Sequence, residues 1–402
     1  MKYIRDPLYS EFIEIDDLTL KVISHPYFQR MRRIRQLGLA EYVYPGATHT
    51  RFSHMLGAYH LSGKFLRRFM EIGEKLDDGE ILSVKLAALL HDIGHTSLSH
   101  ALEFTLLPFR HEEIGMAIIE KKFSDILGKD LVGEILNIFN RKCEPFKYQL
   151  IEGQMDVDRL DYLRRDAYYC GVDYGLIDIE RIIQSSKLYK TSRGREFVLS
   201  TKGIFAAEGY IIARYLMYWS VYYHKTNLGF QAMLFSLFKR VRDLLSEGGD
   251  IFMPKPLKNI IGAKDPYEAV EDILYIDDAL IFYTISEWQK EKDRVVSDLS
   301  RRIINRERFK AVEVKGDFLE EYQKVEVECK RLGFDPKYYI IERTPKDVAY
   351  TPYDPTSEES IKVEVNGTLR ELSSVLPTDT LKSLSREVMR RYLFYPSSPS
   401  TF

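Results

Sequence analysis

The sequence predicts a mainly helical protein with a smaller mixed α+β part toward its C-terminal end. Apolar residues recur at helical spacing through most of residues 10–180 and again through 203–247. The alternation of apolar and polar residues at 361–365 is typical of a strand instead. We therefore expect a helical domain over residues 1–250 and an α+β region over residues 251–402.

The first part of the chain is expected to hold a series of helices joined by short loops. Pro26 stands where a helix-opening proline belongs, and the helix expected after it, 27–37, carries four arginines between its apolar residues. The stretch 44–49 reads Tyr-Pro-Gly-Ala-Thr-His and has the chemistry of a loop. The further helices expected here are 52–74, 80–90, 111–123 and 155–169, the last ending before Gly171.

The pattern changes after residue 185. A polar, glycine-containing turn separates two strand-like halves of 186–200, which predicts a small hairpin inserted in the helical domain. Helix resumes over 203–247, and a proline- and glycine-bearing stretch follows at 248–262. The remaining elements expected are helix at 266–307, strands at 338–342, 361–365 and 368–372 around the Asn366-Gly367 turn, a helix at 381–393 and a frayed Pro/Ser tail.

Composition excludes several classes of protein. Hydrophobic residues make up 45% of the chain and charged residues 29%, which is typical of a globular protein and not of a disordered one. The net charge of −2 gives no global basic field for nucleic acid or an anionic membrane, although nucleic-acid binding stays open. No stretch approaches the roughly 18 apolar residues that a membrane span needs. The three cysteines form neither a zinc pattern nor a disulfide framework, so we expect a cytoplasmic protein.

The histidines are unevenly distributed. Of nine, eight lie between residues 25 and 111. At the centre of this group an apolar helix, 86–90, is followed by His91, Asp92 and, after Gly94, His95. A helix that ends there can present an imidazole and a carboxylate to one metal ion. The alternative is a surface helix end with two solvated polar residues.

Two further ligands are candidates. His54 lies between apolar residues and should be partly buried, which also suits an ordinary core histidine. Asp158 belongs to an acid-rich helix on which Tyr162, Arg165 and Asp166 are expected to share its side. Part of that face could equally be solvated surface charge.

Several motifs follow one another in an order that resembles a known family. They are Phe28-Gln-Arg-Met-Arg-Arg-Ile-Arg-Gln36, Thr50-Arg51-Phe-Ser-His54, His91-Asp-Ile-Gly-His95-Thr-Ser-Leu-Ser-His100, His111-Glu112, Asp156-Val-Asp158-Arg-Leu-Asp-Tyr162-Leu-Arg-Arg-Asp166 and Tyr218-Trp-Ser-Val-Tyr222-Tyr-His224-Lys225. Together they resemble the HD superfamily, and within it the dNTP triphosphohydrolases related to the sterile-alpha-motif/HD-domain protein. The resemblance covers roughly residues 5–235, and no motif match extends beyond about 250.

The resemblance implies an HD-domain helical core and a divalent transition metal. The ion would be Fe, Mn, Ni, Zn or Co, which nitrogen and oxygen ligands do not distinguish, and Mg would accompany the substrate triphosphate. The implied ligands are His54, His91, Asp92 and Asp158. A metal-activated water would attack the α-phosphorus of a dNTP and release deoxynucleoside and inorganic triphosphate. His95 is implied as the acid that protonates the leaving oxygen, and His111, oriented by Glu112, is the second proton-transfer candidate.

Substrate contacts are implied in the same way. Positive side chains and a histidine would hold the triphosphate: Arg51, His100, Arg159, Arg214 and Lys225. Gln36 and Asp166 would bond the sugar, while Tyr162 would exclude a 2′-hydroxyl. Tyr222 would line the pocket two helical turns from Arg214. Helix capping or packing is the alternative role of His100 and His111. A core helix would explain most of the aromatic residues in 210–223 equally well.

Regulation and partners are less defined by the sequence. Gln29 and Arg32 match part of a second nucleotide site in the resembled family, but Ser24 stands where an acidic residue would help to read guanine. The alternative substrates are a nucleoside monophosphate, a guanosine alarmone or GTP. A non-catalytic sensor of nucleotides or single-stranded nucleic acid is a further alternative. We expect a homo-oligomer, a dimer or higher, with no membrane partner.

Overall fold

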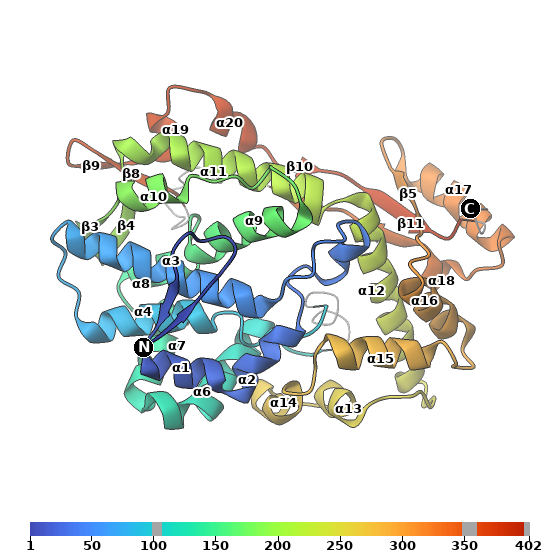
Figure 1. Cartoon of the computed structure of the whole chain (residues 1–402). Helices are drawn as coiled ribbons and strands as arrows, with labels where there is room; N and C mark the ends of the chain where they lie inside the picture. The colour runs from blue at the N-terminus through green and yellow to red at the C-terminus, as the bar shows by residue number, and fades with distance from the viewer. Residues whose placement is uncertain (99–106, 348–359, 398–402) are drawn as a thin grey trace.

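The helical core is organised around one long helix, α3 (Arg51–Glu71), which crosses the middle of the molecule (Figure 1). The computed structural model describes residues 1–98, 107–347 and 360–397. Helix α3 packs against α4 (Asp78–Leu90) and α9 (Val157–Cys170). A capping box between Asp77 and Glu80 starts α4, and Gly171, in the left-handed conformation with φ 69°, ends α9. Three helices with defined ends therefore meet at the centre of the fold.

Further helices surround this core. Those before the hairpin are α1 (Asp17–Ser24), α2 (Pro26–Gln29), α6 (His111–Leu127), α7 (Lys129–Phe139), α8 (Pro145–Ile151) and α10 (Ile179–Ser185), with short 3-10 turns η1 (Arg30–Arg33) and η2 (Gly38–Tyr42). After it come η3 (Thr201–Gly203), α11 (Ile204–Met217), the π-helical turn η4 (Tyr218–Tyr222) and α12 (Lys225–Ser246). The C-terminal helices are α13 (Lys255–Ile261), α14 (Pro266–Ile273), α15 (Asp278–Trp288), α16 (Arg294–Ile304), α17 (Phe318–Arg331), α18 (Pro336–Tyr339), α19 (Leu372–Val375) and α20 (Thr380–Leu384).

The strands form small sheets at the edges of the molecule. At the N-terminus β1 (Lys2–Ile4) pairs with β2 (Ile13–Ile15), and β7 (Lys346–Asp347) pairs with β10 (Val388–Met389). Strands β5 (Lys310–Glu313), β11 (Tyr392–Tyr395) and β6 (Ile341–Arg343) form a three-stranded sheet in that order. The four-stranded sheet has the order β3 (Ser186–Thr191), β4 (Gly194–Ser200), β8 (Lys362–Val365) and β9 (Thr368–Glu371). The expected fold class, mainly helical with small sheets toward the C-terminus, is confirmed.

Both predicted hairpins are present, and they join one another. Strand β8 runs parallel to β4, with Val363 opposite Leu199. Asn366 and Gly367, with φ 50° and 80°, form the turn between β8 and β9, because such positive angles suit these residue types. Residues more than 160 apart in the chain are thereby placed in one sheet.

Three predicted elements are wrong in type or extent. The helix expected over 27–37 stops after a few residues, since η1 continues α2 only to Arg33 and Ile34 is extended. The strand expected at 338–342 begins only at Ile341, because Pro336 opens the short helix α18 before it. The helix expected over 381–393 ends at Leu384, and the residues after it form β10 and β11, whose partners lie far away in the chain.

Helix α12 connects the two parts of the chain. It packs against α16, β5, β6 and α18 on the C-terminal side and against η2 and η4 on the other. Figure 1 shows it running between the blue and green helices of the core and the orange and red C-terminal elements. Among the described residues, no helix is both long and apolar enough to cross a membrane.

Candidate metal centre and adjoining cavity

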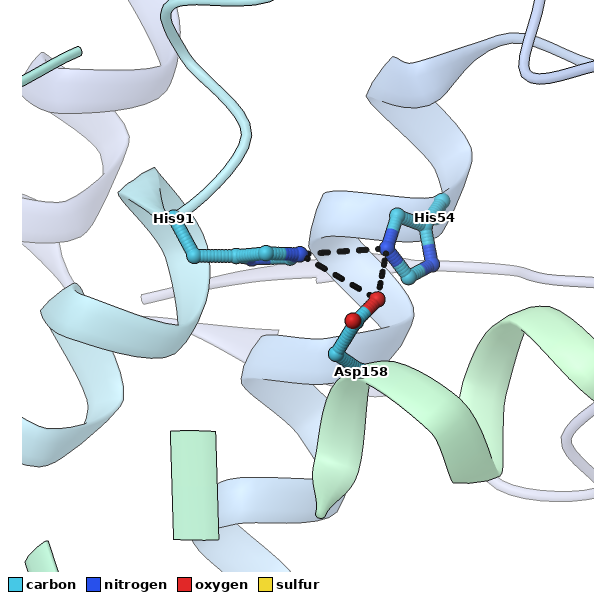
Figure 2. A group of neighbouring side chains, drawn as sticks. All are labelled: His54, His91 and Asp158. Atoms are coloured by element: carbon cyan, nitrogen blue, oxygen red, sulfur yellow. Dashed lines mark hydrogen bonds and ion pairs between the residues drawn. The ribbon is translucent and has the colours of Figure 1, made fainter. Parts of the chain in front are cut away.

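Three side chains from the three central helices converge on one point (Figure 2). His54 comes from α3, Asp158 from the first turn of α9, and His91 caps the C-terminal end of α4. His54 Nε2 lies 3.0 Å from Asp158 Oδ1 and 3.2 Å from His91 Nε2, and His91 Nε2 lies 3.4 Å from Asp158 Oδ1. Metal bonds of about 2.1 Å at right angles place neighbouring donor atoms about 3 Å apart, so these separations fit one shared ion.

The outer nitrogens of both histidines are held by acceptors. His54 Nδ1 lies 2.8 Å from Asp161 Oδ1, and His91 Nδ1 lies 2.9 Å from the Ala88 carbonyl oxygen. Both Nδ1 atoms therefore carry the hydrogen, and each Nε2 turns its lone pair toward the other donor atoms. This is the arrangement that metal-binding histidines adopt, and the donor set fits a divalent transition metal.

Asp92, the fourth predicted ligand, lies next to this group. Its oxygens are 3.5 Å from His91 Nε2 and 3.7 Å from His54 Nε2. Arg51 Nη1 donates to Asp92 Oδ2 at 2.5 Å, and His95 Nε2 lies 3.3 Å from Oδ1. The Asp92 carboxylate therefore contacts the candidate metal ligands on one side and Arg51 and His95 on the other.

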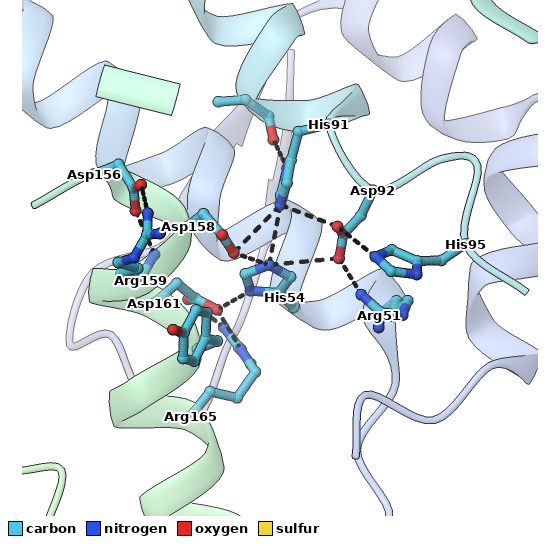
Figure 3. Close-up of polar contacts among 12 residues, drawn as sticks. Arg51, His54, His91, Asp92, His95, Asp156, Asp158, Arg159, Asp161 and Arg165 are labelled. Atoms are coloured by element: carbon cyan, nitrogen blue, oxygen red, sulfur yellow. Dashed lines mark hydrogen bonds and ion pairs between the residues drawn. The ribbon is translucent and has the colours of Figure 1, made fainter. Parts of the chain in front are cut away.

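A buried network behind His54 was not predicted. Asp161 accepts hydrogen bonds from Arg165 Nε at 2.8 Å, Arg165 Nη2 at 2.9 Å and the Tyr9 hydroxyl at 2.6 Å (Figure 3). Arg165 also donates to Asp6 at 2.9 Å. Arg165 was expected to share the side of Asp158, Tyr162 and Asp166, but it points away from them. The spacing of an aspartate and an arginine four residues apart was the available signal.

The titration behaviour of the cluster suits a bound cation. Burial alone would lower the pKa of His54, but Asp158 and Asp161 outweigh burial and raise that pKa to about 10. Burial alone would raise the pKa of Asp158, but its hydrogen bonds to His54 and His91 hold it well below the ordinary value. The carboxylates therefore favour positive charge at this point, whether carried by protons or by a metal ion.

His95 lies next to the centre in a different environment. Burial lowers its pKa well below the ordinary value, and the charge of Arg51 adds to the effect. Its ring stacks on that of His111 with the centroids 3.7 Å apart, and Glu112 Oε2 lies 3.4 Å from His111 Nδ1. Gly94 permits this stacking, because a methyl group there would lie 2.0 Å from the His111 carbonyl oxygen.

A cavity of about 790 Å³ adjoins the centre. The predicted residues that line it are Gln36, Arg51, Asp92, His95, His111, Asp158, Tyr162, Asp166 and Tyr222. The lining also includes residues that were not predicted, among them Tyr218, Asn227, Gln231, Phe235 and Arg343. The motifs could not indicate Phe235 and Arg343, since Phe235 lies at the edge of the resembled stretch and Arg343 lies beyond it.

Two predicted sugar-binding residues have distinct settings in the cavity wall. Asp166 is buried and pairs with His49 Nε2 at 2.8 Å, while its second oxygen accepts from the Tyr222 hydroxyl at 2.7 Å. Gln36 Oε1 is buried too, but no donor among the described residues reaches it. A ligand hydroxyl is the kind of donor that would satisfy this oxygen.

Other predicted substrate contacts do not line the cavity. Arg159 donates to the Gly153 carbonyl oxygen at 2.6 Å and pairs with Asp156. Arg214 lies 5.4 Å from the centre of the Tyr218 ring, and Lys225 is exposed at the start of α12. His100 lies outside the described residues.

The predicted second nucleotide site is occupied by internal contacts. Gln29 Nε2 donates to the Ile23 carbonyl oxygen at 2.8 Å, and Arg32 Nε donates to Gln29 Oε1 at 2.9 Å. The Arg32 guanidinium lies 3.4 Å from the centre of the Phe52 ring. Binding there would have to compete with these contacts.

Comparison with known proteins places the chain in a family. The model of the HD domain matches residues 51–166, and that of the HD associated region matches residues 177–246. The Bacillus subtilis protein YwfO is 33% identical over 383 residues, which span 92% of this chain and 87% of YwfO. A solved phosphohydrolase structure from Bacteroides thetaiotaomicron has a TM-score of 0.88 and 33% identity, covering 98% of this chain and 100% of that one. The chain belongs to the HD-domain phosphohydrolases.

More distant relatives of this HD-domain phosphohydrolase include the deoxynucleoside triphosphate triphosphohydrolases SAMHD1. The Dictyostelium discoideum homologue is 28% identical over 278 residues, and the human protein 24% identical over 345 residues. The alignments span 53% and 54% of those proteins, about half of their length. The predicted resemblance is confirmed at the level of the family and of a distant similarity to SAMHD1.

Proposed function

We propose that this HD-domain phosphohydrolase hydrolyses deoxynucleoside triphosphates to deoxynucleosides and inorganic triphosphate. The observation that carries the proposal is the cavity of about 790 Å³, which adjoins the metal centre and is lined by Gln36, Tyr162 and Asp166. Its volume falls within the range of small-ligand pockets, roughly 300–1,000 Å³. The distant similarity to SAMHD1 supports the same substrate class.

The residues divide the work of phosphate-ester hydrolysis. His54, His91 and Asp158, with Asp92 beside them, would hold a divalent ion, which when bound supplies Lewis acidity and lowers the pKa of a coordinated water. Arg51 lines the cavity and offers positive charge to the phosphate oxygens. His95 is neutral before substrate binds because burial and Arg51 lower its pKa.

Substrate charge changes the state of His95. A polyphosphate in the cavity brings several negative charges close to the ring, and nearby negative charge raises the pKa of an imidazole. The protonated Nε2 would then donate to the leaving 5′-oxygen. His111 stacks on His95 and, held by Glu112, keeps the ring in place.

Sugar recognition follows from the unsatisfied oxygen of Gln36. This oxygen would accept the single hydrogen of the 3′-hydroxyl, and Asp166, fixed by His49 and Tyr222, would line the sugar beside it. Tyr162 lines the same part of the cavity and would crowd a 2′-hydroxyl.

The test is a product assay. The protein, loaded in turn with Fe, Mn, Ni, Zn or Co and supplied with Mg, is incubated with each dNTP and NTP, and the products are identified by mass. We expect triphosphate and deoxynucleoside from dNTPs. Pyrophosphate, orthophosphate or no turnover of any dNTP would contradict the proposal and favour another nucleotide substrate or a sensor. Asp158→Asn should abolish turnover, and Asp125→Asn, at an exposed position of α6, should leave it unchanged.

A homo-oligomer in the cytoplasm completes the proposal. The three cysteines are unpaired, as a reducing compartment requires. Large apolar side chains at separate positions, such as Leu176, Phe205 and Val327, are 73%, 62% and 69% exposed and available for contact with a second copy. Light scattering coupled to gel filtration measures the mass directly, and a monomer at micromolar concentration would contradict this part.

A further inference from the structure

One wall of the cavity is built by a single face of helix α12 together with strand β6. Asn227, Gln231, Leu234 and Phe235 line the cavity and follow one another at spacings of four, three and one, which places them on one side of the helix. Arg343 of β6 completes this wall, and its guanidinium carbon lies 4.4 Å from the centre of the Phe235 ring. We refer to these five residues as the α12–β6 wall.

Two polar groups of the α12–β6 wall, the Asn227 side-chain oxygen and the Arg343 guanidinium, have no hydrogen-bond partner among the described residues. Asn227 is 3% exposed, and its Nδ2 donates to the Tyr222 carbonyl oxygen at 3.3 Å. Its Oδ1 is buried, and no donor in the described part of the chain reaches it. Within residues 1–98, 107–347 and 360–397, the Arg343 guanidinium likewise has no hydrogen bond or ion pair beyond its ring contact. Burial also lowers the pKa of Arg343. Desolvated groups of this kind cost free energy unless a ligand pairs with them.

The α12–β6 wall lies next to the residues that would read the sugar. Tyr222 connects the two, because its hydroxyl donates to Asp166 while its carbonyl oxygen accepts from Asn227. A nucleotide with its phosphates at the metal centre and its sugar at Gln36 and Asp166 would therefore reach the wall with its base. Phe235 and Leu234 offer apolar surface, while Arg343, Gln231 and Asn227 offer hydrogen-bonding groups.

We propose that the α12–β6 wall is a nucleobase subsite in which Arg343 selects guanine over adenine. The inference rests on the proposed nucleotide substrate. Arginine presents only donors, in a fork that matches the O6 and N7 acceptors of guanine. Adenine places an amino group at the same edge, so that donors would face donors. The exocyclic amino group of guanine also supplies a donor of the kind that Asn227 Oδ1 lacks.

The experiment compares dGTP with dATP on wild-type protein, Arg343→Met and Arg343→Lys. Dissociation constants are measured by calorimetry in EDTA, where no turnover occurs, and kcat/KM is measured on the metal-loaded protein. A bidentate contact discriminates bases by roughly 1–3 kcal/mol, so we expect wild type to prefer dGTP by about 5- to 150-fold in both measurements. Met should bring the ratio close to one by weakening dGTP alone, and Lys should give an intermediate ratio because it keeps charge but not the fork.

Arg331→Met is the matched control, since Arg331 is an exposed residue of α17 that pairs with Glu328 three residues before it. It should leave both constants unchanged. The melting temperature of each variant shows whether it is folded.

The outcomes separate this inference from the proposed function. No dGTP preference in wild type, a ratio that survives Arg343→Met, or an equal loss for both nucleotides would overturn the nucleobase subsite. Triphosphate release with any of these results leaves the proposed hydrolysis standing. A dGTP preference in binding that Arg343→Met removes, without turnover of any dNTP, supports the subsite and overturns the hydrolysis.

Discussion

His54 contacts a different group of polar side chains through each of its two ring nitrogens. Its Nε2 faces Asp158 and His91, while its Nδ1 hydrogen-bonds to Asp161, which Arg165 and Tyr9 hold from behind. An imidazole fixed in one tautomer and one orientation is a better ligand than one that can rotate. Asp161 would therefore act on a bound metal ion through His54, as a positioning residue.

Asp161→Asn should weaken metal binding. An amide in this place directs its NH₂ group at donors from Arg165, Tyr9 or His54, and it removes the charge that pairs with Arg165. We expect metal affinity to fall about 10- to 100-fold and the free energy of unfolding to fall by about 3 kcal/mol. Competition with a chromophoric chelator measures the first, and urea unfolding of the metal-free protein measures the second.

Asp6→Asn is the matched control, because Asp6 contacts Arg165 but not His54. It should lower stability while changing metal affinity by less than about threefold, the effect expected of a residue three contacts away from His54. Equal losses of affinity in the two variants would mean that Asp161 serves the fold alone.

The residues of the candidate metal centre could be predicted, and those behind them could not. His54, His91 and Asp158 were found from residue type and motif, and the structure brings their donor atoms together. Asp161 lies on the helix that the sequence shows only as acid-rich. Its burial depends on Asp6 and Tyr9, which are more than 150 residues away. Local sequence carries no signal for such a contact.

Helices α3 and α9 approach each other closely at Gly57. A methyl group at this position would lie 1.8 Å from Asp161 Oδ2 and 2.6 Å from Arg165 Nη2. The absence of a side chain thus lets α9 bring its carboxylate up to His54. The metal centre depends on this spacing between two helices as well as on its ligands.

Gly57→Ala should displace Asp161 and loosen the centre. We expect the free energy of unfolding to fall by roughly 1–3 kcal/mol, as for other overpacked sites, and metal affinity to fall by about tenfold or more. Gly63→Ala on the same helix is the control: its methyl group would meet only Lys85 Cε at 3.7 Å. That variant should gain up to about 1 kcal/mol from helix propensity. Thermal unfolding and metal titration of both variants measure these effects. Unchanged stability and metal affinity in Gly57→Ala would contradict the prediction, because they would show that α3 and α9 can move apart without harm.

Elements with strong local signals were predicted better than those fixed by distant partners. Helices α3, α4, α6 and α9 follow their periodicity, and the turn at Asn366 and Gly367 follows from residue type. The helix predicted over 381–393 is wrong beyond Leu384, because strands β7, β5 and β6 pair with the later residues as β10 and β11. Periodicity over a short segment cannot register partners supplied by the rest of the chain.

At the scale of the whole molecule, the C-terminal part completes the helical part. Strand β8 extends the hairpin of β3 and β4, and Arg343 lines the cavity beside the metal centre. The family motifs end near residue 235, so the sequence predicted no function for residues 251–402. That the cavity draws on both parts follows from the packing of α12, which sequence patterns do not encode.

A substitution of Trp288 can show whether the helical part of the chain, residues 1–250, and the C-terminal part, residues 251–402, unfold together. It is fully buried in α15, its ring centroid lies 6.1 Å from that of Phe238 in α12, and its Nε1 donates to the Phe252 carbonyl oxygen at 2.6 Å. Trp288→Ala should cost about 3–5 kcal/mol. If α12 couples the two parts, this loss of stability must lower the temperature of metal release by as much as it lowers the temperature of overall unfolding. Release is followed with a chromophoric chelator and unfolding by circular dichroism, with Tyr283→Ala, an exposed position of the same helix, as the unchanged control. A metal-release temperature that stays constant while the unfolding signal splits into two steps would instead define two independent units, and the cavity between α9 and β6 would then open and close with their contact.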